Sequence, residues 1–355
     1  MSCDGDSAIR GQIEAVEDLL HSAAVRSRES RGRATFEDPC PMRSAFQIDR
    51  ERIVHTNAFR RLKHKTQVFI APTGDHYVTR LSHTLEVTYT ARTIARALNV
   101  NEDLVEAIAL GHDLGHAPFG HVGEQILDEM ATNGFSHSRQ SLRIVDSVEG
   151  RGSGLNLTWE VRQGIVAHSK PRGDFVSGPR AAGLTLEAQI CRIADAVAYL
   201  NHDVKDAIRA GLISEMDIPE KVRSVMKIGM LDSMIRDVVE HSLLDESSFK
   251  NKHQAISMGD PMREAVNILR EFMFDRVYLP TNSCQQGQTA RLIMRFLYGY
   301  LVDHPEEIPK GYFSDEGTSE KATVDYLAGM TDYFALRMSE RLQPGISGDI
   351  FERLF

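Results

Sequence analysis

The amino-acid sequence predicts an all-α protein, built as a helical bundle with an additional C-terminal helical region. Apolar residues recur at three- and four-residue spacing through most of the chain, as on the buried face of a helix. Strand-like alternation is scarce, and clusters of Gly, Pro and Ser separate the periodic segments. These three observations indicate helices joined by loops.

Three regions follow from this pattern. Residues 1–50 predict an N-terminal arm, in which the amphipathic stretch IEAVEDLL precedes the Arg-rich, Gly- and Pro-containing segment SRESRGRATFEDPCPMR. Residues 51–210 form the predicted core, with helical patterns in HTLEVTYTARTIARAL, EDLVEAIALGHDL, EQILDEMA and EAQICRIADAVAYL. Residues 211–355 hold further amphipathic segments, MREAVNILREFMFDRVYL, TARLIMRFLYGYLV and KATVDYLAGMTDYFALRMSERL. Residues 150–156 and 169–185 are expected to be loops, acting as lids or linkers.

Composition excludes several classes of protein. Hydrophobic residues make up 42% of the 355 residues, which is too apolar for general disorder. The net charge of −9 argues against a broad nucleic-acid surface. The chain has no apolar run of membrane-spanning length, and acids occupy the N-terminus where a signal peptide would be apolar, so we expect a cytoplasmic protein. The four cysteines include no CxxC pair and are expected to be reduced and mostly buried.

Four residues make a metal-site pattern. They are His83, the adjacent His112 and Asp113, and Asp195. Asp195 lies among apolar residues in a predicted helix, where an unpaired charge would cost several kcal/mol. A single histidine is more often a hydrogen-bonded core or surface residue, but four such groups on three helices favour a shared cation. Two imidazoles and two carboxylates suit Mn²⁺, Fe²⁺ or hydrated Mg²⁺.

The surrounding sequence resembles the deoxyguanosinetriphosphate triphosphohydrolase family of the HD superfamily. The stretches FRRLKHKTQVF, DHYVTRLSHTLEV, EAIALGHDLGHAPFGHVGE, TWEVRQGIVAHS, EAQICRIADAVAYLNHDVKDAIRAGLI and VDYLAGMTDYFAL carry the likeness, which covers roughly residues 28–340. The resemblance implies an HD-domain helical bundle. It also implies hydrolysis of a deoxynucleoside triphosphate to a deoxynucleoside and tripolyphosphate, with the four residues above as the metal ligands.

The same resemblance implies an acid–base group. His116 and His121 match histidines beside the α-phosphate, and Glu124 matches a carboxylate that partners the second. If a helix starts after Gly120, Glu124 lies one turn beyond His121 on the same face. An ion pair at the start of a helix is the alternative explanation. His137 resembles a further active-site histidine.

Substrate-side roles are implied for four residues. Arg80, three residues before His83, would contact phosphate, for which a planar guanidinium is suited. Gln67, Tyr199 and Asp203 match contacts to the deoxyribose, although Tyr199 could be plain core and Asp203 could pair with a surface cation, Lys205 or Arg209.

Other basic residues near the predicted site have less definite roles. The run Arg60, Arg61, Lys63 and Lys65 could line an anionic pocket or a solvated helix face. Lys170 and Arg172 could close over the substrate or remain exposed loop charges.

Two positions depart from the family pattern. Ile48 and Val78 stand where arginines are usual. Neither is a candidate ligand or acid–base residue, so the departures bear on arm packing or substrate preference rather than on catalysis.

Two alternatives to this function remain open from the sequence. An HD protein could act as a phosphatase or phosphodiesterase on another nucleotide, or the chain could be a sensor of nucleotides or of single-stranded DNA. The resemblance also implies a homo-oligomer, and weak binding of single-stranded DNA is compatible with the local basic run.

Overall fold

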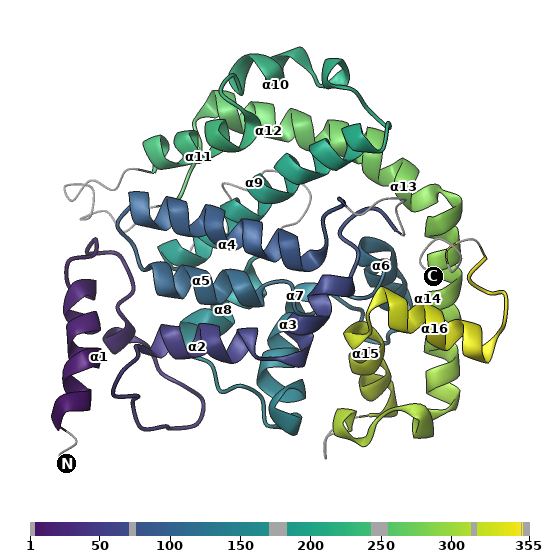
Figure 1. The fold of residues 1–355 in the computed structure, drawn as a ribbon, viewed down its shortest axis with the longest axis horizontal. Coiled ribbons are helices and arrows are strands. Elements are labelled where there is room, and N and C mark those ends of the chain that lie inside the picture. Colours follow the sequence, from purple (N-terminus) through teal and green to yellow (C-terminus); the bar gives the residue numbers. More distant parts are fainter. Residues whose placement is uncertain are drawn as a thin grey trace.

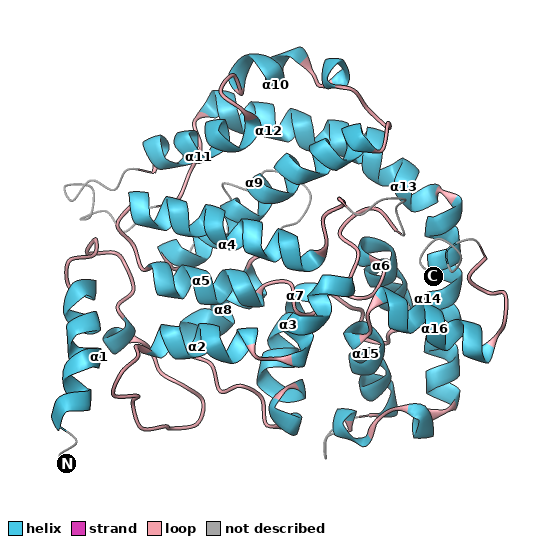
Figure 2. Cartoon of the chain, viewed as in Figure 1, coloured by secondary structure: helices cyan, strands magenta, loops and turns pink. Residues whose placement is uncertain are grey.

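The computed structural model describes residues 4–70, 76–169, 183–242, 255–313, 318–348 and 350. Within these ranges the all-α prediction is confirmed, because the β structure consists of two isolated bridges, Arg33–Thr158 and Thr66–Thr79 (Figure 2). The loop expected at 169–185 lies outside the described residues from 170 to 182, and with it Lys170 and Arg172.

The first part of the chain forms helices α1 to α9, which run from purple to teal in Figure 1. These are α1 (Asp4–Glu17), α2 (Ala45–Val54), α3 (Asn57–Arg61), α4 (Arg80–Ala97), α5 (Glu102–Gly111), α6 (Gly120–Met130), α7 (His137–Arg143), α8 (Trp159–Ala167) and α9 (Leu186–Arg209). A π-helical turn, Ile144–Val148, extends α7, and 3₁₀ turns lie at Ser27–Glu29, Leu62–His64 and Gly150–Gly152.

The later part continues the helical pattern. Its helices are α10 (Glu220–Val225), α11 (Met230–His241), α12 (Asp260–Met273), α13 (Leu279–Ser283), α14 (Gln285–Asp303), α15 (Ser319–Gly329) and α16 (Asp332–Leu342). A π-helical turn, Phe274–Tyr278, joins α12 to α13, and 3₁₀ turns lie at Glu215–Asp217, Pro305–Glu307 and Lys310–Tyr312.

One amphipathic segment of the sequence divides into two helices. KATVDYLAGMTDYFALRMSERL, treated above as a single segment, breaks at Met330 and Thr331, which have extended backbone angles. The Thr331 side chain accepts a hydrogen bond from the Phe334 amide and so caps a new helix, α16. Apolar spacing alone did not reveal this break, because the residues on both sides keep helical periodicity.

Two separate groups of apolar side chains stabilise the fold. The larger one joins α2, α4, α5, α8 and α9 with α11 and α12. The smaller one joins α6 with α14, α15 and α16, which gather beside α6 in Figure 1. The segment that carries GHDLGHAPFGH therefore starts in the larger core, at α5, and ends in the smaller one, at α6.

A buried lysine and a buried aspartate brace this segment. The Lys65 ammonium donates to the main-chain oxygens of His116 and Ala328. Asp332, at the start of α16, accepts from the amides of Thr66 and Phe119, both at 2.9 Å. The C-terminal helices thus hold the loop between α5 and α6 in position.

Among the described helices, none combines the length and the apolar character that a membrane span requires. The three described cysteines form no disulfide with one another; Cys191 is buried, whereas Cys40 and Cys284 are partly exposed.

Candidate metal centre and surrounding pocket

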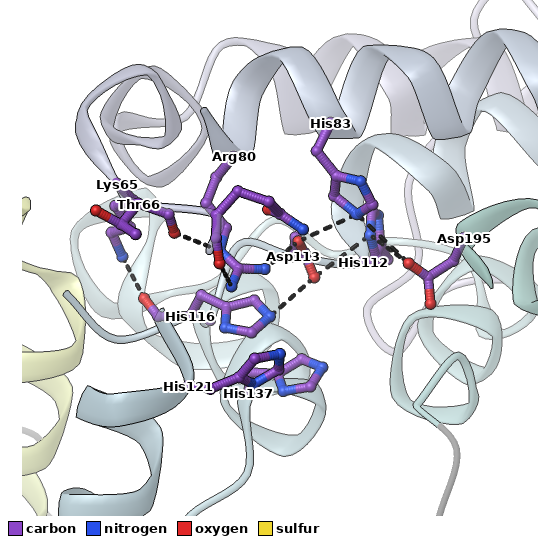
Figure 3. Close-up of polar contacts among 12 residues, drawn as sticks. Lys65, Thr66, Arg80, His83, His112, Asp113, His116, His121, His137 and Asp195 are labelled. Atoms are coloured by element: carbon purple, nitrogen blue, oxygen red, sulfur yellow. Dashed lines mark hydrogen bonds and ion pairs between the residues drawn. The ribbon is translucent and has the colours of Figure 1, made fainter. Parts of the chain in front are cut away.

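Four side chains from three segments meet at one point (Figure 3). His83 comes from the first turn of α4, His112 and Asp113 follow the last residue of α5, and Asp195 lies in the middle of α9. Asp195 Oδ1 is 3.4 Å from His83 Nε2 and 4.0 Å from His112 Nε2. Asp113 places Oδ1 3.3 Å from His112 Nε2 and Oδ2 3.7 Å from His83 Nε2. The sequence grouped these residues, and the structure brings them together.

The donor set fits a divalent cation. His112 Nδ1 lies 2.6 Å from the Ala109 carbonyl, to which it must donate, so Nε2 carries a lone pair. This Nε2 atom is fully buried and has no hydrogen-bond partner among the described residues. Burial lowers the pKa of His83 and favours the neutral imidazole that binds metals. A buried, unpartnered nitrogen beside two carboxylates is the arrangement expected of a cation's ligand set.

Arg80 holds Asp113 from the other side. Its Nη1 atom donates to Asp113 Oδ2 at 2.9 Å, and Nε donates to the Thr66 carbonyl at 3.1 Å. Burial by itself would raise the pKa of Asp113, but the neighbouring imidazoles of His112 and His116 and the Arg80 guanidinium hold it well below the usual range. Asp113 is therefore a carboxylate, the form that a metal ligand requires.

The pair expected between His121 and Glu124 is present but loose. α6 begins at Gly120 as expected, and His121 Nδ1 lies 3.8 Å from Glu124 Oε2. The closer partner is His137, whose Nδ1 atom lies 2.8 and 2.9 Å from the two carboxylate oxygens of Glu124. Burial opposes charging of His137, but the Glu124 carboxylate outweighs it and raises the pKa of this imidazole. Sequence spacing pointed to His121, whereas tertiary packing pairs Glu124 more tightly with His137.

His116 lies between the proposed metal ligand Asp113 and the Glu124–His137 pair. Its Nε2 atom is 3.2 Å from Asp113 Oδ1, and its ring stacks on His137 with 3.9 Å between ring centres. Burial, reinforced by Arg80, lowers the pKa of His116 well below the usual range, so this imidazole is neutral. His121, by contrast, has a side chain that is 64% exposed and stands at the rim.

The opposite wall carries the two α9 residues assigned to the sugar. Tyr199 and Asp203 both line the pocket, as their four-residue spacing on one helix predicts. Asp203 is buried and accepts a hydrogen bond from the Tyr278 hydroxyl at 2.6 Å, so its pairing with a surface cation is wrong. Arg209 pairs with Asp206 instead.

A pocket of about 230 Å³ connects these walls. Beyond the residues above, it is lined by Gln67 and by residues of the α12 end and the following π-helical turn, including Arg270, Phe274 and Tyr278. π-helical turns often occur at functional sites, and this one supplies Phe274 and Tyr278 to the pocket lining.

The basic run at residues 60–65 was expected either to line an anionic pocket or to form a solvated helix face. Its four basic side chains do not line the pocket. Lys65 is buried and bonds to main-chain oxygens, and Arg61 donates to the Tyr312 hydroxyl at 3.3 Å. Arg60 and Lys63 are exposed. The pocket is lined from this segment by Gln67 and Val68.

Two histidines that the sequence analysis did not single out belong to the site. His202 Nε2 lies 2.9 Å from His83 Nδ1, and His168 Nε2 lies 3.0 Å from His137 Nε2. His202 had a sequence signal, because it follows Asp195 by seven residues, two helical turns, and forms a second His-Asp pair with Asp203. The signal for His168 was weaker: it is the second-to-last residue of the helical stretch TWEVRQGIVAHS. Arg270 and Tyr278 carried none.

Comparisons with known proteins agree with this geometry. The HD domain family matches residues 80–200, and the phosphohydrolase-associated domain family matches residues 256–341. The chain is 47% identical to a deoxyguanosinetriphosphate triphosphohydrolase-like protein of Caldanaerobacter subterraneus subsp. tengcongensis, over 90% of both chains. Proteins of the same description from Desulfatibacillum aliphaticivorans and Clostridium perfringens strain 13 are 44% and 42% identical, covering 94% and 91% of this chain and 97% and 94% of theirs.

Among solved structures, a hypothetical protein from Aquifex aeolicus aligns with 22% identity and a TM-score of 0.44, covering 86% of this chain and 71% of that one. The family matches and the curated relatives cover the helices that form the site. The chain therefore belongs to the deoxyguanosinetriphosphate triphosphohydrolase-like family of HD-domain phosphohydrolases.

Proposed function

We propose that this protein hydrolyses deoxynucleoside triphosphates to a deoxynucleoside and inorganic tripolyphosphate. The observation that carries the proposal is the convergence of four side chains at the base of a pocket: His83, His112, Asp113 and Asp195. The His112 Nε2 atom faces both carboxylates and has no hydrogen-bond partner among the described residues. The relatives' description as deoxyguanosinetriphosphate triphosphohydrolase-like supports the substrate class.

Under this proposal the four residues hold Mn²⁺ or Mg²⁺, with Fe²⁺ as a third candidate. Such an ion, when bound, polarises a phosphoryl oxygen and lowers the pKa of a bound water. Arg80 adds a fixed positive charge at the pocket wall, because its guanidinium is already held by Asp113 and the Thr66 carbonyl. A guanidinium held in this way contacts a phosphate oxygen without losing further side-chain freedom.

The histidines on one side of the pocket, His116, His121 and His137, are proposed to position the substrate and to transfer a proton to the leaving group. We assign the proton for the departing 5′-oxygen to His121, which stands exposed at the rim with Glu124 3.8 Å behind its Nδ1 atom. His116 is buried and neutral beside Asp113, where it contacts the α-phosphate. Glu124 orients His137 by a charge-assisted hydrogen bond.

The pocket residues of α9, Tyr199 and Asp203, are proposed to recognise the sugar. Asp203 is held at Oδ2 by the Tyr278 hydroxyl and at Oδ1 by His202, and each oxygen keeps a second lone pair that can accept a hydrogen bond from a 3′-hydroxyl. Burial raises the pKa of Tyr199 to about 12, so its ring remains a neutral packing surface for the deoxyribose. Gln67 completes this side, because its buried Oε1 atom lacks a hydrogen-bond partner within the described part of the chain.

Product analysis tests the proposal. The purified protein is incubated with each of the four deoxynucleoside triphosphates and Mn²⁺ or Mg²⁺, and the products are separated by ion exchange. We expect deoxynucleoside and tripolyphosphate. Orthophosphate alone would instead favour a phosphatase or phosphodiesterase acting on another nucleotide.

Variants test the site. Asp195→Ala should remove turnover and weaken Mn²⁺ retention, since it deletes a ligand without disturbing the Arg80–Asp113 bond. Asp303→Ala, at the exposed end of α14, is the matched control and should behave as wild type. Full activity of Asp195→Ala would show that the site is assigned wrongly.

Self-association and weak binding of single-stranded DNA also stay proposals. The exposed side chains of Arg60 and Lys63 provide a local positive surface on a chain of net charge −9. Sedimentation measures the assembly, and titration with a short oligonucleotide at two salt concentrations measures the binding, which should weaken as salt rises.

A further inference from the structure

A second cavity lies on the other side of the helix that carries Asp195. It has a volume of about 580 Å³, lies between α9, α10 and α11 at the top of Figure 1, and shares no lining residue with the pocket described above. A cavity of this size is in the range of small-molecule sites. From α9 it is lined by Asn201, Val204, Lys205 and Ile208. Helical geometry places these four residues roughly opposite to Tyr199 and Asp203.

The side chain of Asn201 is buried at this cavity without a hydrogen-bond partner. The residue is 8% exposed, and it lines the cavity. Neither its carboxamide oxygen nor its nitrogen bonds to any residue in the described part of the chain. Burying an amide without a partner is costly, so such a group is expected to face a ligand or an ordered water.

The first turn of α11 borders the same cavity, which Gly229, Met230 and Leu231 line. The N-cap residue of this helix is Gly229, which has no side chain to accept hydrogen bonds from the first amides. Uncapped amides at the start of a helix, together with the helix dipole, favour an anion. The start of α11 and the Asn201 amide therefore offer hydrogen-bond donors to one ligand.

The charges of the lining favour a ligand with one negative charge. Three basic and two acidic side chains line the cavity: Lys205, Arg223, Lys227, Glu215 and Asp232. Lys227 forms no ion pair with a described residue, whereas Lys205 also lies near Glu86 of α4. Arg223 Nε donates to the Ile218 carbonyl at 3.0 Å, which holds the guanidinium in place. One positive charge is left over in the lining, which does not match the several negative charges of a nucleoside triphosphate.

The remaining lining is aliphatic. Val204, Ile218, Val222 and Met226 are buried side chains that line the cavity. No aromatic residue is among the lining residues, so a nucleobase would find no ring to stack on. Methylene groups placed against these side chains would leave water, which is favourable.

We propose that this cavity binds a monocarboxylate with an unbranched aliphatic chain, of the medium-chain fatty-acid class. The carboxylate accepts hydrogen bonds from the Asn201 amide and from the first amides of α11, and Arg223 and Lys227 supply positive charge. The hydrocarbon chain lies against the aliphatic lining. This site goes beyond the proposed function and does not depend on it, because the two cavities have no residue in common.

Calorimetric titration of the full chain with hexanoate, octanoate and decanoate tests the ligand class. We expect one saturable site per chain, with an affinity that rises up to about fourfold for each added methylene group. Decan-1-ol and decylammonium should bind about tenfold more weakly than decanoate, because they lack the negative charge. The absence of saturable decanoate binding below about 1 mM would overturn the inference, and so would equally tight binding of decylammonium.

Variants locate the bound carboxylate. Asn201→Asp should weaken decanoate binding at least about tenfold, because it replaces a donor with a negative charge. If this variant does not fold, Lys227→Glu at an exposed position provides the second test and should act in the same direction. Lys221→Ala is the matched control, because this exposed lysine of α10 pairs with Glu264 and does not line the cavity. It should bind decanoate as wild type does.

Two results of these variants would overturn the assignment. Wild-type affinity in both Asn201→Asp and Lys227→Glu would mean that decanoate binds elsewhere. A change in sedimentation of Lys227→Glu, with no decanoate binding by the wild type, would mean that a second copy of the chain covers this surface.

Discussion

His83 Nδ1 lies 2.9 Å from His202 Nε2, while the other nitrogen of His83 faces Asp195 and Asp113. A ring that binds a cation through Nε2 carries its proton on Nδ1, so His83 donates to His202. His202 in turn lies with Nδ1 2.8 Å from Asp203 Oδ1. The chain His83–His202–Asp203–Tyr278 therefore links the proposed metal ligand to the proposed sugar contact.

His202→Ala should weaken Mn²⁺ binding at the proposed metal site about 10–100-fold, because His83 loses the acceptor that orients its ring. His202→Gln should restore part of the affinity, since a side-chain carbonyl can accept the same bond. Equilibrium dialysis measures both, and Lys205→Ala, an exposed change one turn further along α9, is the control. Unchanged affinity in a folded His202→Ala protein would mean that the contact does not orient the ligand.

Asp332→Ala should destabilise the fold by about 3 kcal/mol, because it leaves the buried amides of Thr66 and Phe119 without their acceptor. It should also lower turnover, since Phe119 belongs to the loop that carries His116 and leads into α6, where His121 lies. Urea unfolding measures the first effect and steady-state kinetics the second. The control Asp303→Ala should change the free energy of unfolding by less than about 0.5 kcal/mol. An equally small change in Asp332→Ala would show that the bonds from Thr66 and Phe119 to Asp332 do not stabilise the fold.

Gly115→Ala should prevent stable folding or cost several kcal/mol. A Cβ atom there would lie 2.3 Å from the Ser141 nitrogen and 2.4 Å from the His137 oxygen, both main-chain atoms that cannot move alone. Gly299→Ala on α14 is the matched control, because a Cβ there meets nothing within 4 Å. That change should stabilise the helix by about 0.5–1 kcal/mol. Similar melting temperatures for the two variants would contradict the close approach of α7 to the His-Asp loop.

Glu187→Gln should alter the pH dependence of stability. Glu187 is completely buried near the start of α9, and burial raises its pKa to about 7 from the value of 4.5 expected in the unfolded chain. The folded state therefore holds more protons between these values, and this group contributes stability below pH 4.5 that is lost as the pH rises through 7.

The loss corresponds to about 3 kcal/mol between pH 5 and pH 8. A glutamine keeps the oxygen that accepts from the Val25 amide at 2.9 Å and carries no charge. The variant should thus equal wild type near pH 5 and exceed it at pH 8, as measured by urea unfolding at both values. If the free energies of unfolding of wild type and variant change equally between pH 5 and pH 8, Glu187 is not the source of this pH dependence.

Local sequence was sufficient to predict the helical segments and to single out the four proposed metal ligands. Three- and four-residue periodicity marks a helix wherever it occurs, and a carboxylate such as Asp195 in an apolar helix signals a buried partner. The sequence also placed Tyr199 and Asp203 on one face of α9, because helical geometry alone determines that relation.

Tertiary structure decided which side chains meet. The number of residues between Glu124 and His137 does not determine whether their side chains touch. His137 becomes the closest partner of Glu124 only because α7 packs against α6. His168 reaches the site because α8 ends beside α5, and Tyr278 because the turn after α12 faces α9. Periodicity specifies the buried face of each helix, but the pairing of faces far apart in the chain depends on packing the whole core at once.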